Sequence, residues 1–342
     1  MDPQWRFSLS ELRETPSCLP LEEEMSRRHK GIDWLMRVGA TLRMGLGPCL
    51  TAATYFHRFY MRRMLEDYHE YEIAATCLFL ASKTEENGKR LEDLVIVALA
   101  KIRSIPPNQV AGSYDAEAKR WENVILTYEE VLLEVLCFDF NIHYPHAFLA
   151  DIASSLESSR QRSGPLVECI WSVAHDSYRT PLCVLESPQV IAAACLLFAQ
   201  SLIDGPEGPS LTQRLEVQQH GEPNWRQILG ITENDLQSIA IALTVLCQFY
   251  RSCAHKDQSK PDVTPYKLIE PPTLDLEVPQ LFKPVSSSST TNGIKSFVQS
   301  TNGSKTPADP LGTVPSTPFP LPPVSPSPMQ SQSPTSPLSG QA

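Results

Sequence analysis

Two apolar segments occur twice in this chain, and this repeat limits the possible folds more than any other feature of the sequence. EIAATCLFLASK at residues 72–83 returns as VIAAACLLFAQS at 190–201, and VLLEVLC at 131–137 returns as IALTVLC at 241–247. The order of the two segments is the same in both halves. Because each copy is one supersecondary unit, the chain is expected to fold as two similar halves.

The repeat preserves the apolar residues but not two of the charges. Ser201 stands at the position of Lys83 in the second copy, and Ile239 stands at the position of Glu129. The repeated scaffold can therefore form without this lysine and this glutamate. We expect Lys83 and Glu129 to belong to a site that binds a partner.

Hydrophobic spacing predicts an all-α chain of two tandem five-helix repeats. Apolar residues recur at helical intervals through both halves, and no segment shows convincing β-strand alternation. The predicted helices cover residues 21–44, 48–65, 70–86, 89–102, 121–138, 146–156, 165–178, 188–202 and 235–250, with a weaker one at 225–229. Short connections between them favour antiparallel neighbours.

The third helix of each half is apolar nearly all round, so it should lie in the middle of its bundle. Small residues such as Ala74, Ala75 and Ala81 let neighbouring helices approach it closely. By contrast, residues 108–119 form a polar insert. Residues 204–224 form a connection that is expected to be mobile because of its length.

The composition changes near residue 260. Seventeen of the 30 prolines lie beyond it, together with seven Ser/Thr-Pro dipeptides and little charge. Such a segment cannot bury enough apolar surface to offset the entropy lost on ordering. The predicted organisation is an N-terminal extension (1–20), a first repeat (21–142), a second repeat (143–255) and a disordered tail (256–342).

Charge and composition exclude several classes of function. A net charge of -10 is unfavourable for nonspecific DNA binding, which depends on Lys and Arg neutralising phosphates. The nine cysteines form no CxxC pair and lie mostly in apolar runs, which is typical of a reducing compartment. No secretion signal is evident, and VIAAACLLFA at 190–199 is about half the length of a membrane span. We expect a soluble intracellular protein without membrane contact.

No enzyme motif is present in the sequence. His143 and His146 flank a proline turn without an acidic or cysteine ligand at metal spacing. Gly-rich phosphate loops and kinase catalytic motifs are missing as well. We expect no catalytic residue, no metal and no cofactor.

Four motifs follow one another through the first repeat and the start of the second. They are FHRFY (56–60), AATCLFLASKTEE (74–86), YEEVLLEVLCFDF (128–140) and HYPHAFL (143–149). With the doubled helical pattern, these motifs resemble the cyclin box of the transcription-type cyclins, the cyclin T, K and L group with similar fungal cyclins. The resemblance runs from about Thr15 to Tyr250.

The resemblance implies a noncatalytic regulatory subunit that forms a heterodimer with a cyclin-dependent kinase and activates it. It further implies that this kinase phosphorylates elongation factors and the C-terminal domain of RNA polymerase II, which the cyclin meets only indirectly. A nuclear location follows from the same resemblance.

The resemblance also implies which residues contact the kinase. In that family, the lysine that ends the third helix and a glutamate early in the fifth do so, and these positions match Lys83 and Glu129. A kinase is active only when the glutamate of its C-helix pairs with its ATP-binding lysine, so a partner that favours the inward position of that helix activates it. We expect Leu133 and Phe138 to line an apolar groove that receives the kinase helix, although apolar residues at helical spacing are more often core.

Some of these residues have alternative explanations. Lys83 would also be favoured as a solvated cation at a helix C-terminus. Glu130, the next residue after Glu129, could occupy the position of the family's glutamate in its place. His57 and Arg58 are expected to serve internal packing and hydrogen bonding. The polar stretch RRHKGI (27–32) occupies the place where cell-cycle cyclins carry an apolar substrate-docking patch, so docking by that route is not expected.

Two other classes of function remain open. General transcription factors of the TFIIB type share the double repeat, but they need a basic face and usually a zinc ribbon, and the sequence shows neither. A helical scaffold would bind other proteins without activating a kinase. Co-purification with a kinase would distinguish the regulatory subunit from both.

Overall fold

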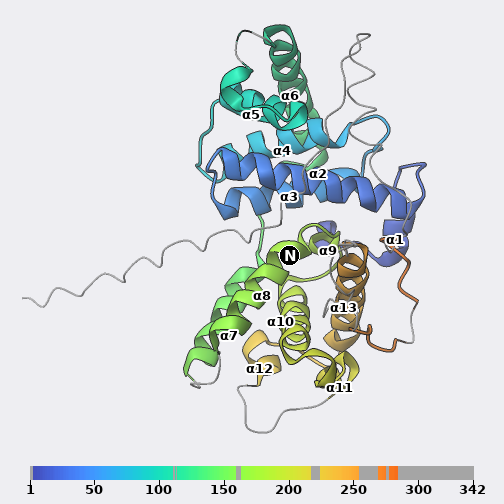
Figure 1. Ribbon diagram of the computed structural model, residues 1–342. Coiled ribbons are helices and arrows are strands. Elements are labelled where there is room, and N and C mark those ends of the chain that lie inside the picture. The colour runs from blue at the N-terminus through green and yellow to red at the C-terminus, as the bar shows by residue number, and fades with distance from the viewer. Residues whose placement is uncertain are drawn as a thin grey trace, which may run out of the picture. The chain divides into compact units, whose positions relative to one another are not determined.

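Two helical repeats, preceded by a short N-terminal segment, form most of the described chain (Figure 1). The computed structural model describes residues 3–110, 112, 114–158, 163–216, 224–253, 269–274 and 277–283. All of them belong to one compact unit within residues 1–302. Helices dominate these residues and none of them forms a strand, as the hydrophobic spacing predicted.

The first repeat contains five helices in the predicted order: α2 (Leu21–Thr41), α3 (Leu46–Tyr60), α4 (Glu70–Thr84), α5 (Leu91–Arg103) and α6 (Asp115–Val135). Helix α4 is the central one and packs against the other four. Ala74, Ala75 and Ala81 are completely buried, which confirms the close approach predicted for this helix.

The second repeat repeats this plan with additional short helices: α7 (Pro145–Ser158), α8 (Ser163–Ser177), α9 (Leu182–Leu185), α10 (Pro188–Asp204), α11 (Leu211–Glu216), α12 (Trp225–Leu229) and α13 (Asp235–Ser252). Helix α10 is central and packs against α7, α8 and α13. Ser187 is the N-cap of this helix, and its hydroxyl accepts from the Val190 amide. Pro188 occupies the first helical position.

Helix α10 runs to Asp204, past its predicted end at residue 202. Pro188–Glu207 has the length and composition of a membrane-crossing helix, with a mean hydropathy of 1.3. However, 67% of this window is buried inside the protein. A central position in the second repeat accounts for the apolar sequence of this helix.

Two connections differ from the prediction. Helix α6 begins at Asp115, inside the predicted polar insert, because the Asp115 carboxylate accepts from the Gly112 amide at 2.9 Å and Glu117 pairs with Arg103 of α5 at 2.8 Å. The predicted loop 204–224 contains α11 and a 3₁₀ turn at Gly205–Glu207. Residues 217–223 of that loop lie outside the described residues.

The predicted N-terminal extension is packed into the fold. Trp5 is fully buried between the guanidinium groups of Arg58 and Arg62, and its indole donates to Asp139 at 2.8 Å. The Phe7 amide donates to the carbonyl of Val184 in α9 at 2.8 Å, which links this segment to the second repeat. The short helix α1 (Leu9–Arg13) follows it.

The FHRFY motif has the internal role that the sequence analysis gave it. His57 Nε2 lies 3.0 Å from the carbonyl oxygen of Tyr178, and burial lowers the pKa of His57 to about 3. Arg58 donates to the carbonyls of Asp139 and Asn141 at 3.1 and 3.3 Å. These bonds hold α3 against the segment that leads into the second repeat.

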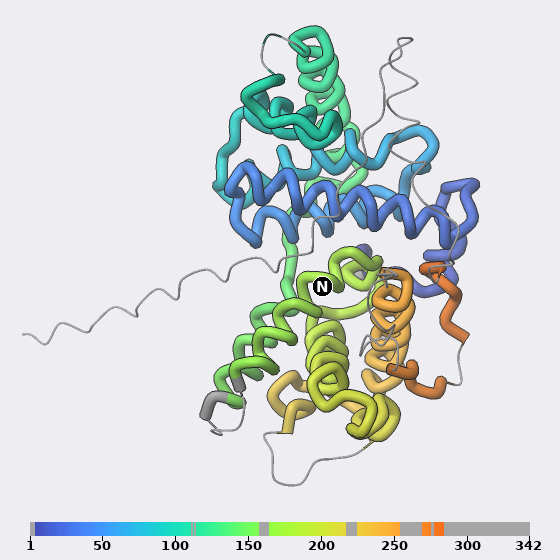
Figure 2. Tube along the Cα trace, viewed as in Figure 1, coloured from blue at the N-terminus to red at the C-terminus, as the bar shows by residue number. Residues whose placement is uncertain are grey.

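Part of the predicted tail is also packed. Residues 269–274 and 277–283 lie beside α13, as the chain trace shows (Figure 2), and Leu281 and Phe282 are buried. The expectation of disorder is therefore wrong for these two segments. The rest of the predicted tail, including all seven Ser/Thr-Pro dipeptides, lies outside the described residues.

All nine cysteines are free, and most are at least partly buried. Burial raises the pKa of the Cys49 thiol to about 12. Cys18 and Cys137 are exposed.

Candidate functional site

Lys83 and Glu129 meet on the surface of the first repeat. Lys83 is in the last turn of α4, and its Nζ donates to both carboxylate oxygens of Glu129 on α6, at 2.7 and 2.8 Å. The lysine side chain is 47% exposed and the glutamate side chain 13% exposed. The structure thus brings together the two charges that the repeat comparison singled out, and Glu130 is exposed beside them.

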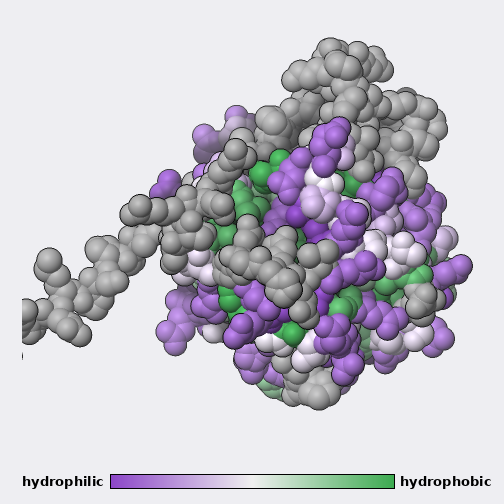
Figure 3. All heavy atoms as spheres, turned by 90° about the horizontal axis from the view of Figure 1, so that it is seen from below, coloured by the Kyte–Doolittle hydropathy of each residue, from purple (hydrophilic) through white to green (hydrophobic). Residues whose placement is uncertain are grey.

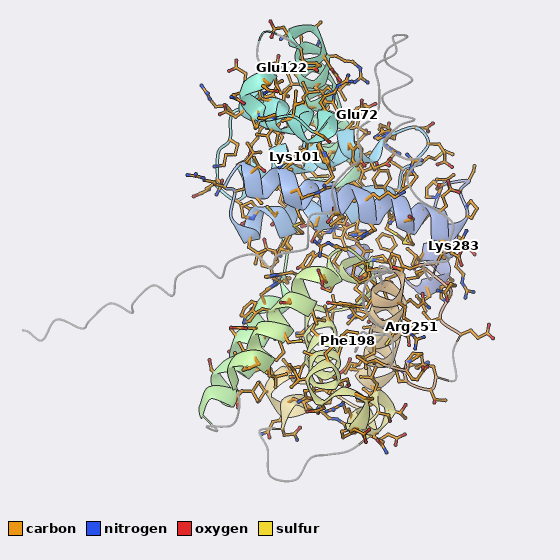
Figure 4. The ribbon with its side chains drawn as sticks, viewed as in Figure 1. Glu72, Lys101, Glu122, Phe198, Arg251 and Lys283 are labelled. Carbon is orange, nitrogen blue, oxygen red and sulfur yellow. The ribbon has the colours of Figure 1, made fainter. Side chains whose placement is uncertain are left out.

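The packing of α6 on α4 creates this meeting point. Helix α6 buries an apolar stripe at helical spacing: Trp121, Ile125, Leu132, Val135 and Leu136. Arg120 at one end of α6 pairs with the buried Glu72 of α4 at 2.7 Å; Figure 4 labels Glu72. Two ion pairs therefore fix the register of the same two helices.

The corresponding positions in the second repeat have no surface role. Ser201 of α10 is buried and donates to the Leu197 carbonyl of its own helix at 3.1 Å. Ile239 of α13 is fully buried. The same scaffold positions hold an exposed lysine and a mostly buried glutamate, paired with each other, in the first repeat and interior groups in the second.

Phe79 supports Lys83 from below. The ammonium of Lys83 lies 4.0 Å from the centroid of the Phe79 ring, which is one helical turn earlier on α4 and nearly buried. A cation over a ring face is attracted by the ring quadrupole. The sequence analysis missed Phe79, although its spacing of four residues from Lys83 is the signal that could have identified it.

The end of α6 presents an exposed aromatic ring. Cys137 and Phe138 both have left-handed backbone conformations, with φ of 52° and 56°, and the Phe138 amide donates to the Leu133 carbonyl at 3.2 Å. This backbone conformation is unfavourable for residues other than glycine. The Phe138 side chain is 67% exposed, and its ring lies 6.4 Å from that of Phe140.

Leu133 is half-buried on α6, one turn after Glu129. Its spacing places it on the same helical face as Glu129. Lys83, Glu129, Leu133 and Phe138, with Phe79 and Cys137, are called the α4–α6 surface below. It combines an exposed cation, a carboxylate and an exposed aromatic ring.

The polar stretch 27–32 has structural partners. Arg27 pairs with Glu70 of α4, with a shortest distance of 2.5 Å. Arg28 is buried against Glu24 and donates to the Tyr60 carbonyl at 2.5 Å. Both arginines are therefore engaged in contacts within the first repeat.

His143 and His146 have separate surroundings. His146 stacks on His175 with ring centroids 5.1 Å apart and contacts Trp171. Burial lowers the pKa of His146 to about 3 and that of His175 to about 4. Within the described residues, no group of three or more His, Cys, Asp or Glu side chains is arranged to hold a metal ion.

Comparison with known proteins agrees with this architecture. Residues 7–141 match the family model described as the cyclin N-terminal domain. Cyclin pch1 of Schizosaccharomyces pombe is 34% identical over 261 residues, which cover 75% of this chain and 72% of that protein. The chain belongs to the cyclin family.

Its relatives place it among the transcription-type cyclins. Human Cyclin-K is 28% identical over 80% of this chain and 44% of its own length, and Cyclin-T1-4 of Arabidopsis thaliana is 26% identical over 69% and 42%. The chain thus spans less than half the length of these two relatives. As a cyclin it is a regulatory subunit and not a catalytic one.

A solved structure shows the same fold. A chain in the crystal structure of the yeast RNA Pol II CTD kinase CTDK-1 complex aligns with a TM-score of 0.52 and 16% identity, over 91% of this chain and 86% of that one. At this level of identity the likeness shows the fold alone.

Proposed function

We propose that this chain binds and activates a cyclin-dependent kinase through the α4–α6 surface, and that the kinase phosphorylates the C-terminal domain of RNA polymerase II. The single observation that carries the proposal is the Lys83–Glu129 pair, in which the lysine is exposed, on the helix α6 that ends in the exposed ring of Phe138. The membership in the transcription-type cyclins supports it. A nuclear location belongs to the same proposal.

The chemistry of the surface suits recognition of a kinase helix. An ammonium has three N–H donors, and two of those on Lys83 are directed at Glu129, which leaves capacity for a partner group. The Phe138 ring and Leu133 supply apolar contact area, which gives affinity. The charges of Lys83 and Glu129 would fix the position of the kinase helix on this surface, because a shifted helix would bring like charges together.

Exposure of Phe138 is itself an argument for a partner. A large aromatic side chain that is 67% exposed, on a strained turn, gains little in the isolated protein. Covering the ring with a partner would bury most of its area. A docking function accounts for both the exposure and the unusual backbone.

The electrostatics of the first repeat support a protein partner over DNA. Several of its arginines are neutralised by carboxylates, as in the pairs Arg27–Glu70, Arg103–Glu117 and Arg120–Glu72. Phosphate binding needs cations that are free to replace counterions. The promoter-binding alternative therefore has little support in these contacts.

The test is purification of the tagged chain from its own cells, identification of the bound proteins by mass spectrometry, and a kinase assay on a polymerase heptad peptide. We expect a protein kinase to co-purify and Lys83→Glu to reduce both recovery and activity. Lys101→Glu is the matched control, because Lys101 is an exposed lysine on α5 of the same repeat (Figure 4).

Three results would contradict the proposal. Absence of any kinase from the purified material would favour the scaffold hypothesis. Equal loss with Lys83→Glu and Lys101→Glu would show a nonspecific charge effect. A gel shift with promoter DNA that weakens steeply with salt would favour the TFIIB-type function.

A further inference from the structure

Residues 277–283 lie beside α13 and are held there by a side-chain amide. Gln248 of α13 donates from Nε2 to the Pro279 carbonyl at 3.1 Å, and its Oε1 accepts from the Leu281 amide at 2.7 Å. One glutamine thus satisfies a backbone donor and a backbone acceptor of the segment. Within 277–283, no residue belongs to a helix or a strand.

Two apolar side chains anchor the segment. Leu281 is fully buried and Phe282 is 4% exposed. The Phe282 ring contacts that of Phe249 of α13 edge-on, with centroids 5.5 Å apart. Burial of this extent normally belongs to core residues, yet here it is reached by two adjacent residues of a segment rich in proline and polar residues.

Exposed polar contacts lie at both ends of the segment. The ammonium of Lys283 lies 3.3 Å from the carboxylate of Glu22, in the first turn of α2, and Figure 4 labels Lys283 there. At the other end, the Glu277 carbonyl accepts from Arg13 of α1 at 3.5 Å. The receiving surface therefore consists of α1, α2 and α13, which we call the α13 groove.

The α13 groove extends past the segment that fills it. A cavity of about 580 Å³ adjoins Glu277 and is lined by residues of the N-terminal segment and of the second repeat, among them Phe7, Leu185 and Ile241. Glu186 in its wall is buried, and burial raises the pKa of this carboxyl to about 7. A ligand longer than residues 277–283 can therefore gain contacts that this segment does not make.

These contacts have the form of peptide recognition. A side-chain amide binds the backbone, two adjacent apolar side chains are buried, and Glu22 lies 3.3 Å from the ammonium of Lys283. We propose that the α13 groove is a binding site for a peptide with the pattern Pro-x-Leu-Phe-Lys, and that the chain's own residues 277–283 occupy it in cis. A second protein with a Leu-Phe-Lys motif of this kind would bind by displacing that segment.

Tethering determines how the site responds to a competitor. The segment follows α13 in the chain after residues 253–276, so it competes at the millimolar effective concentration typical of a short connection. An added peptide should therefore bind the wild-type chain roughly tenfold or more weakly than a chain whose own segment is detached. Each buried anchor should change the peptide's binding constant by about tenfold to a hundredfold.

The test uses the full chain and a fluorescent peptide of residues 269–284, followed by anisotropy. We expect the variant Leu281→Ala/Phe282→Ala, whose own segment is weakened, to bind the peptide at least about tenfold more tightly than the wild type does. Adding Gln248→Ala to this variant should weaken the binding again. A peptide carrying alanine at positions 281 and 282 is the control and should not bind.

A second experiment covers the case in which the double variant fails to fold. A protease site inserted between Ser259 and Lys260 of the otherwise wild-type chain is cut after purification. The released fragment should stay bound through gel filtration and dissociate when excess peptide is added. The proposal is overturned if the fragment leaves without peptide, if excess peptide cannot displace it, or if the alanine peptide binds as well as the natural one.

Figure 3 gives the surface context of this proposal. On the face shown there, the coloured apolar residues lie in separate small patches among hydrophilic ones. A buried Leu-Phe pair in the α13 groove is therefore different in kind from the isolated apolar residues that are normal on a protein surface.

Discussion

Exchanging the two charges of the Lys83–Glu129 pair separates a partner role from a local structural one. In the double variant Lys83→Glu/Glu129→Lys, the two side chains can still pair with each other across α4 and α6. A purely structural pair would therefore survive the exchange. A surface that binds a kinase through these charges would no longer match the charges of the kinase after the exchange.

The expected magnitudes differ enough to be measured. Because Lys83 is 47% exposed, the pair should contribute only about 0.2–1 kcal/mol to the free energy of unfolding. Hydrogen bonds to charged groups in a complex are worth about 1.5–3 kcal/mol each. Losing one such bond corresponds to roughly a tenfold to hundredfold loss of kinase affinity.

Two assays on the wild type, Lys83→Glu, Glu129→Lys and the double variant distinguish a partner role from a structural one. Urea unfolding should show the single variants slightly destabilised and the double variant close to wild type. Kinase binding and activation should be reduced in both single variants and remain reduced in the double variant. Full recovery of activation in the double variant would refute the partner role and leave the pair as a structural contact.

Three further predictions concern stability and accessibility. Arg28→Ala leaves a buried carboxylate without its counter-ion and should lower the free energy of unfolding by about 3–5 kcal/mol, whereas Arg37→Ala, at an exposed pair, should change it by less than about 1 kcal/mol in urea unfolding. The pKa of His57 is lowered to about 3 in the folded chain, so as the pH falls from 6.5 toward 4 the unfolded chain binds the extra proton. The free energy of unfolding should then fall by up to about 1.4 kcal/mol per pH unit, a dependence that His57→Asn should reduce. Maleimide should label the exposed Cys137 and Cys18 first, and kinase binding should protect Cys137, next to Phe138, more than Cys18; unchanged labelling of Cys137 in the complex would contradict the assigned surface.

The helices could be predicted because their apolar residues follow one period over many residues. The buried alanines 74, 75 and 81 and the buried stripe of α6 are direct outcomes of that pattern. The start of α6 at Asp115 could not be predicted in this way, because it depends on the hydrogen bond from the Gly112 amide to the Asp115 carboxylate and on the ion pair of Glu117 with Arg103. These interactions have no periodic signature.

The packing of the N-terminal segment and of residues 277–283 could not be predicted for a different reason. Trp5 lies in a short polar segment, and Phe282 lies in a proline-rich one. Their burial depends on partners far away in the sequence, namely Arg58 and Arg62 for the tryptophan and Phe249 for the phenylalanine. Composition describes what a segment can bury by itself, so it does not detect a groove supplied by the rest of the chain.

The candidate site could be predicted from the sequence only in part. The difference between the repeats predicted where Lys83 and Glu129 matter, and the structure places them in contact. The ring of Phe79 beneath the lysine and the left-handed turn that exposes Phe138 depend on three-dimensional packing. Their contact with a kinase stays a prediction.

Site-specific photo-crosslinking from position 138 tests the central claim most directly. A benzophenone side chain replaces Phe138, and a matched chain carries it at Ile203, which is 50% exposed on the second repeat. The account predicts that light joins the first chain to a protein kinase in cells and that the second chain gives little or no such product. Equal crosslinking from both positions, or none from position 138 while the kinase still co-purifies, would contradict it.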